Sequence, residues 1–119
     1  MEFQFDNNSP IYLQLIQKIK IAIASGEFKP GEKLPAVREL AMESKINPNT
    51  VQRALFQLEE EKLIFTQRTN GKYITENEQK LKELRNELAS NLLNEFTVKM
   101  QQLGFSKQEI LELIKREEK

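Results

Sequence analysis

The chain has 119 residues, and its 18 lysine and arginine residues are balanced by 18 aspartate and glutamate residues. It contains no histidine and no cysteine, which excludes disulfide bonds, thiol nucleophiles and the usual zinc ligands. Because histidine is also the common proton-transfer side chain near neutral pH, we expect a protein that is not an enzyme and holds no metal or cofactor. No apolar run approaches a membrane span and the first residues form no signal peptide, so we expect a cytoplasmic protein without membrane association.

Residues 10–25 have the pattern of an amphipathic helix. Ser9 is a typical N-cap, Pro10 suits the first helical position, and Gly26 is a typical C-terminal stop. Six apolar side chains recur at helical spacing between these ends: Tyr12, Leu15, Ile16, Ile19, Ala22 and Ile23. Residues 26–35 hold two glycines and two prolines, a composition that predicts a loop.

Two shorter helices follow, and a tight turn joins them. The first begins after Pro35, and the second begins at Pro48 with Asn47 as its N-cap and ends near Glu61. Their inward side chains are Val37, Leu40 and Ala41 in the first helix and Val51, Ala54, Leu55 and Leu58 in the second. Because so few residues separate them, the helices must cross sharply, which predicts a helix-turn-helix.

A β-hairpin is expected directly after these helices. Residues 63–66 and 72–75 are rich in β-branched and aromatic side chains, and Asn70-Gly71 lies between them. Asn-Gly favours a two-residue turn in which both central residues have positive φ. A helix-turn-helix followed by a hairpin is a winged helix.

The remaining residues predict a two-helix tail. A capping box from Thr75 to Glu78 opens a helix that Gly104 ends, and a second box from Ser106 to Glu109 opens a shorter one. Two helices cannot enclose this much apolar surface, so we expect a homodimer. The alternative is that the long helix folds back over its own winged helix. The candidate interface consists of Leu81, Leu84, Leu88, Leu92, Phe96, Met100, Leu103, Ile110 and Ile114.

The expected fold class is therefore mainly α, an α+β winged helix. Residues 1–76 would form the winged helix-turn-helix domain and residues 77–119 the two-helix dimerisation domain.

Several motifs in the first domain occur together in one known family. In order they are PGEKLPAVRELA, INPNTVQRAL, LEEEKLI and NGKYI. The stretch that contains them resembles the DNA-binding domain of GntR-type bacterial transcription regulators, and the short tail is similar to that of the YtrA subfamily. The resemblance implies a dimeric repressor that binds double-stranded, palindromic operator DNA of its own operon, often one that encodes an ABC transporter.

The chain departs from the family at a few positions. Family members usually have glycine where this chain has Lys45, Lys62 and Thr69, and often serine at Ala36. If the two lysines keep left-handed backbones, each costs about 1 kcal/mol or more. Thr69 places the minor-groove role of the wing tip in question.

The start of the second short helix supplies the candidate base contacts. Because this turn of a recognition helix enters the major groove, we expect Asn49, Thr50, Gln52 and Arg53 to contact DNA. Asparagine and glutamine can bind adenine in bidentate fashion, and arginine can bind guanine. Arg53 has an alternative role, which is pairing with Gln57 or Glu60 along the helix.

Other residues of the first domain are candidates for phosphate or minor-groove contacts. They are Lys33, Arg38, Lys45, Arg68, Asn70, Gly71 and Lys72. Arg38 occupies the place where the family keeps a DNA-contacting arginine, although pairing with Glu39 or Glu43 is the alternative. Since residues 1–76 carry ten basic and ten acidic side chains, the basic residues must be segregated on one face. We expect Glu59–Glu61 to be a solvated helix end turned away from DNA.

A second class of function remains open from the sequence. Winged helices also serve as protein-interaction modules without sequence-specific DNA binding, and the long helix would then be the docking surface. The operator, the regulated genes and any small-molecule effector are not indicated by the residues.

Overall fold

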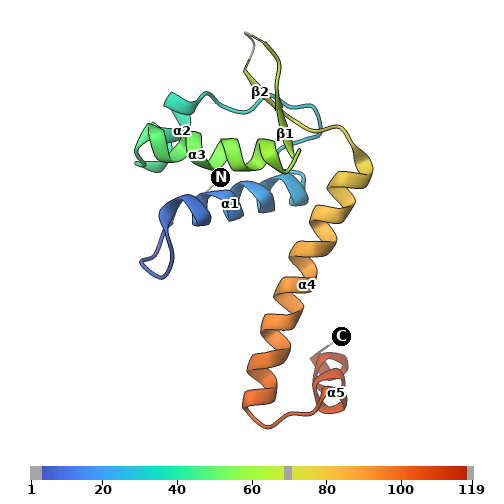
Figure 1. Ribbon diagram of the computed structural model, residues 1–119. Helices are drawn as coiled ribbons and strands as arrows, with labels where there is room; N and C mark the ends of the chain where they lie inside the picture. Colours follow the sequence, from blue (N-terminus) through green and yellow to red (C-terminus); the bar gives the residue numbers. More distant parts are fainter. Residues whose placement is uncertain (1–3, 69–70, 118–119) are drawn as a thin grey trace. The chain divides into compact units, whose positions relative to one another are not determined.

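The computed structural model describes residues 4–68 and 71–117 and is mostly helical, with one small sheet in this part of the chain (Figure 1). The chain divides into two compact units, Met1–Arg85 and Asn86–Lys119. None of the helices in the described part is long and apolar enough to cross a membrane. The predicted mainly α, winged-helix fold class is confirmed.

The first helix, α1, spans Ile11–Ser25 and buries the predicted stripe apart from Tyr12, which is half-buried. Its C-cap, Gly26, has φ 87°, as expected for glycine at a left-handed stop. The predicted N-cap is wrong by one residue, because Pro10 is the cap and Ser9 caps nothing. The Gln14 side chain instead donates to the Ser9 carbonyl at 2.8 Å, which ties the preceding residues to the helix.

Helices α2, Val37–Ser44, and α3, Pro48–Glu60, form the predicted helix-turn-helix. The Asn47 side chain accepts a hydrogen bond from the Asn49 amide at 2.8 Å, so the predicted cap is confirmed. The predicted apolar stripe of α3 is buried, and α3 packs against both α1 and α2. This packing forms the core of the first unit.

Strands β1, Ile64–Thr66, and β2, Lys72–Ile74, pair antiparallel, with Ile64 opposite Ile74. The predicted hairpin is confirmed, and the Gln67 amide donates to the Gly71 carbonyl at 2.9 Å. Gly71, directly before β2, therefore bonds with the residue directly after β1, and its φ is positive, at 101°. Asn70 and Thr69 lie outside the described residues.

A third stretch of chain pairs with β2, in the segment predicted as a loop. The Gly31 amide donates to the Ile74 carbonyl at 2.9 Å, and the Leu34 amide donates to the Lys72 carbonyl at 2.8 Å. Gly and Pro composition did not indicate this pairing, because it depends on residues some forty positions away. As a result, the hairpin is joined to the residues that lead into α2.

Helix α4 spans Glu78–Gln102, close to the length expected. The predicted capping box at Thr75 is wrong. The Asn77 side chain accepts from the Lys80 amide at 3.0 Å, and the Thr75 hydroxyl accepts from the Asn77 amide. The first two turns of α4 belong to the first unit, so the packing division falls later than the domain boundary predicted at residues 76–77.

The second unit consists of the rest of α4 and of α5, Lys107–Glu117. Gly104 follows the end of α4 with φ 96°. The predicted capping box of α5 is confirmed: the Ser106 amide donates to the Glu109 carboxylate at 3.0 Å, and the Ser106 hydroxyl accepts from the Glu109 amide at 3.2 Å. These hydrogen bonds to Ser106 lower the pKa of Glu109.

The left-handed lysines provide a test of backbone strain. Lys45 and Lys62 have φ of 58° and 61°, a conformation that glycine adopts without a steric penalty. We expect Lys62→Gly to raise the free energy of unfolding by about 0.5–1 kcal/mol, after the extra unfolded-state entropy of glycine is subtracted. Urea denaturation measures this change. Lys62→Ala is the matched control, because it removes the charge but keeps Cβ. An equal gain in the free energy of unfolding in both variants would contradict the proposed backbone strain at Lys62.

Candidate nucleic-acid interface

The N-terminal turns of α3 present polar side chains at the surface. Asn49 and Gln52 are exposed and Thr50 is half-buried. The side chains of Asn49 and Gln52 form no hydrogen bond with another residue within 4–68 and 71–117. They are therefore available to an external donor or acceptor.

These side chains line one hollow on the surface of the first unit. Asn49, Gln52, Arg53, Phe56 and Glu59 come from α3, and Lys72 of β2 completes the lining. Phe56 is exposed although it is a large apolar residue, and sequence reasoning did not single it out. Its position one turn after Gln52 on an otherwise polar face is the sequence feature that could have identified it.

Arg38, Lys33 and Lys45 are all exposed. The alternative role of Arg38 is not observed, because no ion pair joins it to Glu39 or Glu43, both of which are described. A Cβ added to Gly71 would lie 3.1 Å from Cε of Lys33, so the lysine stem passes close to the base of the wing. Lys45 is the C-cap of α2 and stands in the turn before α3.

Lys72 is held by groups of its own chain. Its Nζ lies 2.7 Å from Oε1 of Glu59 and donates to the Thr66 hydroxyl at 2.9 Å. The Thr66 hydroxyl donates in turn to Glu59 at 2.9 Å. The hydrogen bond from Lys72, followed by that from Thr66, lowers the pKa of the Glu59 carboxyl.

The prediction of a solvated acidic end of α3 is therefore wrong for Glu59 and Glu61, whereas Glu60 is exposed. Glu59 binds the wing through Lys72, and Glu61 pairs with Lys20 of α1 at 2.9 Å. Both carboxylates connect α3 to a neighbouring element, so they contribute to the shape of the first unit.

Arg53 takes neither of the alternative partners along its helix. Gln57 donates to Glu61 at 3.1 Å, and Glu60 forms no ion pair with Arg53. The guanidinium instead stacks on Tyr12 of α1, with Cζ 3.6 Å from the ring centre. The sequence pattern does not predict this contact, because helical spacing assigns Tyr12 to the buried apolar stripe.

The wing contributes fewer described candidates. Arg68 is exposed with φ 40°, and Gly71 is half-buried. Asn70, a predicted contact, lies outside the described residues.

The second unit exposes much of its apolar surface. Leu92 and Leu103 retain 66% and 74% of their surface, and Phe96 is also exposed. Two residues of the predicted interface are buried instead: Ile110 in this unit and Leu84 in the first unit are each only 5% exposed. Both are covered by residues of their own chain. Leu81, Leu88 and Met100 are half-buried, and Ile114 is exposed.

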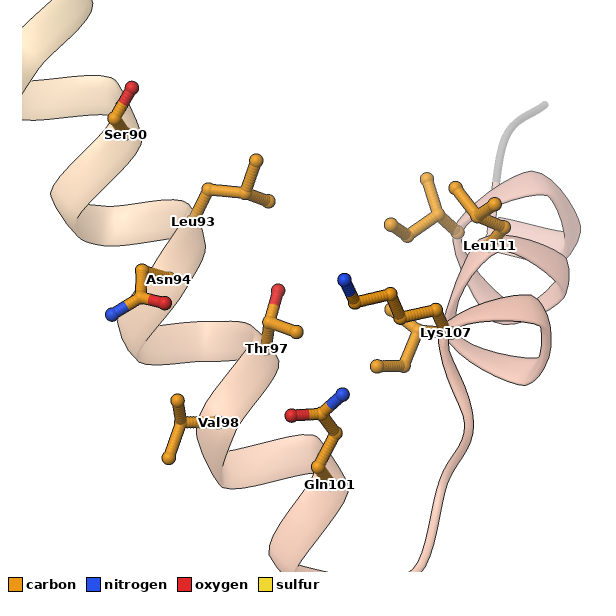
Figure 2. A pocket seen from close by; sticks show the side chains of 10 residues that line it. Ser90, Leu93, Asn94, Thr97, Val98, Gln101, Lys107 and Leu111 are labelled. Carbon is orange, nitrogen blue, oxygen red and sulfur yellow. The ribbon is translucent and has the colours of Figure 1, made fainter.

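A groove of ≈ 580 Å³ separates α4 from α5 within the second unit. Figure 2 shows Leu93 and Thr97 directed from α4 toward α5, and Lys107 directed back toward α4. The other lining residues are Ser90, Asn94, Val98, Gln101, Ile110, Leu111 and Ile114. The groove lies on a different side of α4 from Leu92 and Phe96, which do not line it.

The first unit has the geometry of a DNA-binding module. A helix-turn-helix with unpartnered polar side chains at the start of its second helix, followed by a paired hairpin, defines a winged helix-turn-helix. Among residues 4–68 and 71–117, no cluster of acidic side chains could hold a metal ion.

Comparison with known proteins agrees with this class. The family described as "Bacterial regulatory proteins, gntR family" matches residues 11–74. The chain belongs to the GntR family, and it is a transcriptional regulator with a DNA-binding helix-turn-helix.

One relative extends the similarity over nearly the whole chain, and another is more similar over a shorter stretch. The chain is 40% identical over 115 residues to the "Uncharacterized HTH-type transcriptional regulator YhcF" of Bacillus subtilis, covering 97% of this chain and 95% of that protein. It is 51% identical over 71 residues to the "HTH-type transcriptional repressor YtrA" of the same species, covering 60% of this chain and 55% of that protein. These relatives are regulators and not enzymes.

Solved structures share the fold. A GntR family transcriptional regulator from Listeria monocytogenes superposes with a TM-score of 0.87 at 40% identity, covering 96% of this chain and 100% of that one. YtrA from Sulfolobus acidocaldarius superposes with a TM-score of 0.57 at 29% identity, covering 98% and 94%. Together with the Bacillus repressor, this similarity supports assignment to the YtrA subfamily.

We expect the Glu59–Lys72 ion pair to make a pH-dependent contribution to the free energy of unfolding. The pKa of Glu59 is lowered from 4.5 in the folded chain, so its contribution is present above that value and is lost as pH falls below it. We expect Glu59→Gln to remove part of the acid dependence of stability. Urea denaturation between about pH 7 and about pH 3 measures it.

Glu60→Gln is the matched control, since Glu60 is exposed and forms no hydrogen bond or ion pair with another described residue. An acid dependence that is the same in wild type and Glu59→Gln would show that the pair does not contribute.

Proposed function

We propose that this protein is a homodimeric, sequence-specific repressor that binds a palindromic operator of its own operon. The single observation that carries the proposal is the polar, unpartnered start of α3, where Asn49 and Gln52 are exposed. Helix formation does not require these side chains, whereas reading adenine in the major groove does. A protein that acts on bacterial DNA works in the cytoplasm.

The remaining candidates would hold the protein on the phosphate backbone. Lys33, Arg38 and Lys45 are exposed cations that precede α3, and Arg68 is an exposed cation in the wing. Phosphate contacts set the register of the protein on DNA but do not read sequence. Thr50, in the first turn of α3, can contact a phosphate or a thymine methyl.

Homodimerisation is supported by the apolar surface of the second unit. Leu92, Phe96, Leu103 and Ile114 are exposed large apolar residues, and burying such side chains against a partner is favourable. In this proposal residues 1–76 bind DNA and residues 77–119 dimerise. Similarity to YtrA-type regulators suggests that the operon encodes an ABC transporter.

Affinity for the operator tests the DNA-binding residues. Using the sequence that the protein selects from a random DNA pool, we expect Arg38→Ala and Thr50→Ala each to weaken binding by about 1–3 kcal/mol with the fold intact. Titration by fluorescence anisotropy measures the loss, and circular dichroism checks the fold.

Lys62→Ala is the charge-matched control, because this lysine follows the C-terminal end of α3. Equal affinity in wild type and Arg38→Ala would remove Arg38 from the interface. If the wild type binds only in the non-specific range of about 10⁻⁴–10⁻⁶ M and ignores sequence, the repressor proposal fails and the protein-interaction module is favoured.

Lys45→Gly separates strain from DNA contact. The substitution relieves the left-handed backbone at φ 58° but removes a candidate phosphate contact, so we expect higher stability together with weaker operator binding. Lys62→Gly should give the stability gain alone. Operator affinity that is unchanged by Lys45→Gly would show that Lys45 does not contact DNA.

The oligomeric state tests the second unit. We expect Leu92→Glu combined with Phe96→Glu to give a monomer at micromolar concentration and to weaken operator binding, because a monomer engages one half-site. Sedimentation velocity measures the first effect. Asn91→Glu combined with Gln102→Glu adds the same charge at exposed polar positions of α4 and should leave the dimer intact. A dimer that persists in the Leu92 and Phe96 variant would place the interface elsewhere.

A further inference from the structure

Two side chains that are far apart in the sequence meet at the edge of the proposed DNA-binding surface. Cζ of Arg53, in α3, lies 3.6 Å from the centre of the Tyr12 ring, in the first turn of α1. This distance is well inside the limit of about 6 Å for a cation–π contact. The guanidinium therefore rests against the face of the ring.

The charge of Arg53 is not taken up by a carboxylate. Gln57, one turn further along α3, donates to Glu61 at 3.1 Å, and Glu61 pairs with Lys20 at 2.9 Å. Arg53 forms no ion pair with any other residue of 4–68 and 71–117. An arginine that served only to join two helices would be expected to end on one of these acidic groups.

Stacking leaves the donors of the guanidinium accessible. All five N–H groups of an arginine lie in the guanidinium plane, whereas the tyrosine ring covers one face. Arg53 is exposed and lines the same hollow as Asn49 and Gln52. Its donors therefore lie beside the side chains proposed to contact bases, where a phosphate or a guanine could accept two hydrogen bonds.

We propose that Tyr12 is a positioning residue for DNA recognition, which holds the Arg53 guanidinium in the orientation that DNA requires. This inference rests on the proposed function and extends it to α1, which lies outside the helix-turn-helix. Tyr12 does not itself contact DNA. By restricting the rotamers of a long side chain before binding, it lowers the entropy that Arg53 loses when the complex forms.

A double-mutant cycle tests the proposal. Wild type, Tyr12→Leu, Arg53→Gln and the double variant are titrated, as the full chain, against a short duplex that carries the sequence selected by the wild type from a random pool. We expect Tyr12→Leu to weaken binding about threefold to tenfold and Arg53→Gln at least as much. The double variant should bind no more weakly than Arg53→Gln alone. Tyr12→Phe, which keeps the ring face, should bind like the wild type.

Lys20→Met is the matched structural control, because it breaks another contact between α1 and α3, the pair with Glu61. It should leave DNA affinity unchanged. If Lys20→Met weakens binding as much as Tyr12→Leu, the effect comes from loosening α1 and the proposal is overturned. Equal losses from Tyr12→Leu with and without Arg53 would also overturn it.

If Tyr12→Leu does not fold, Arg53→Lys tests the proposal in its place. Lysine keeps the charge but lacks the planar fork that stacks and donates two hydrogen bonds, so we expect a loss like that of Arg53→Gln. Wild-type affinity in Arg53→Lys would overturn the proposal. A duplex of scrambled sequence distinguishes failure of the proposed function from failure of this inference. If the wild-type protein binds both duplexes equally, the proposed function is contradicted. If Tyr12→Leu still prefers the selected duplex and binds it with wild-type affinity, only the role of Tyr12 is contradicted.

Discussion

The burial of one stripe of α3 is the constraint on which the rest of the first unit depends. Val51, Ala54 and Leu58 have no exposed surface, and Leu55 has 1%. Because a helix has 3.6 residues per turn, burying these positions leaves Asn49 and Gln52 on the outer side. Replacing one of the buried leucines with alanine would cost about 2–5 kcal/mol, so the same packing that stabilises the domain also decides which side chains DNA can meet.

The local features could be predicted from the sequence, and the contacts between distant residues could not. Asn47 caps α3 and Gly26 ends α1 as expected, because each depends on neighbouring residues only. The pairing of residues 31–34 with β2 and the stacking of Arg53 on Tyr12 depend on how elements pack. Glycine and proline composition predicts that residues 31–34 form a loop, and helical spacing predicts that Tyr12 is a core residue. Neither pattern reveals that residues 31–34 pair with β2 or that Tyr12 contacts Arg53.

The neutral charge of the chain gives local geometry more weight. With 18 basic and 18 acidic residues, long-range attraction to DNA is small, and affinity must come from a few well-placed side chains. One of the candidate cations, Lys72, is also bound by Glu59 of its own chain at 2.7 Å. In the proposed homodimer, the joining of two such surfaces would raise operator affinity, and the apolar surface of the second unit supports that proposal.

The hydrogen bonds between residues 31–34 and β2 have a mechanical consequence. The Leu34 amide donates to the Lys72 carbonyl, and α2 begins at Val37, only three residues later. The hairpin is therefore hydrogen-bonded to the backbone that leads directly into α2. These hydrogen bonds connect the hairpin to the residues just before α2, the helix that carries Arg38. A displacement of the hairpin should therefore also displace the start of α2, so the positions of the two elements are coupled.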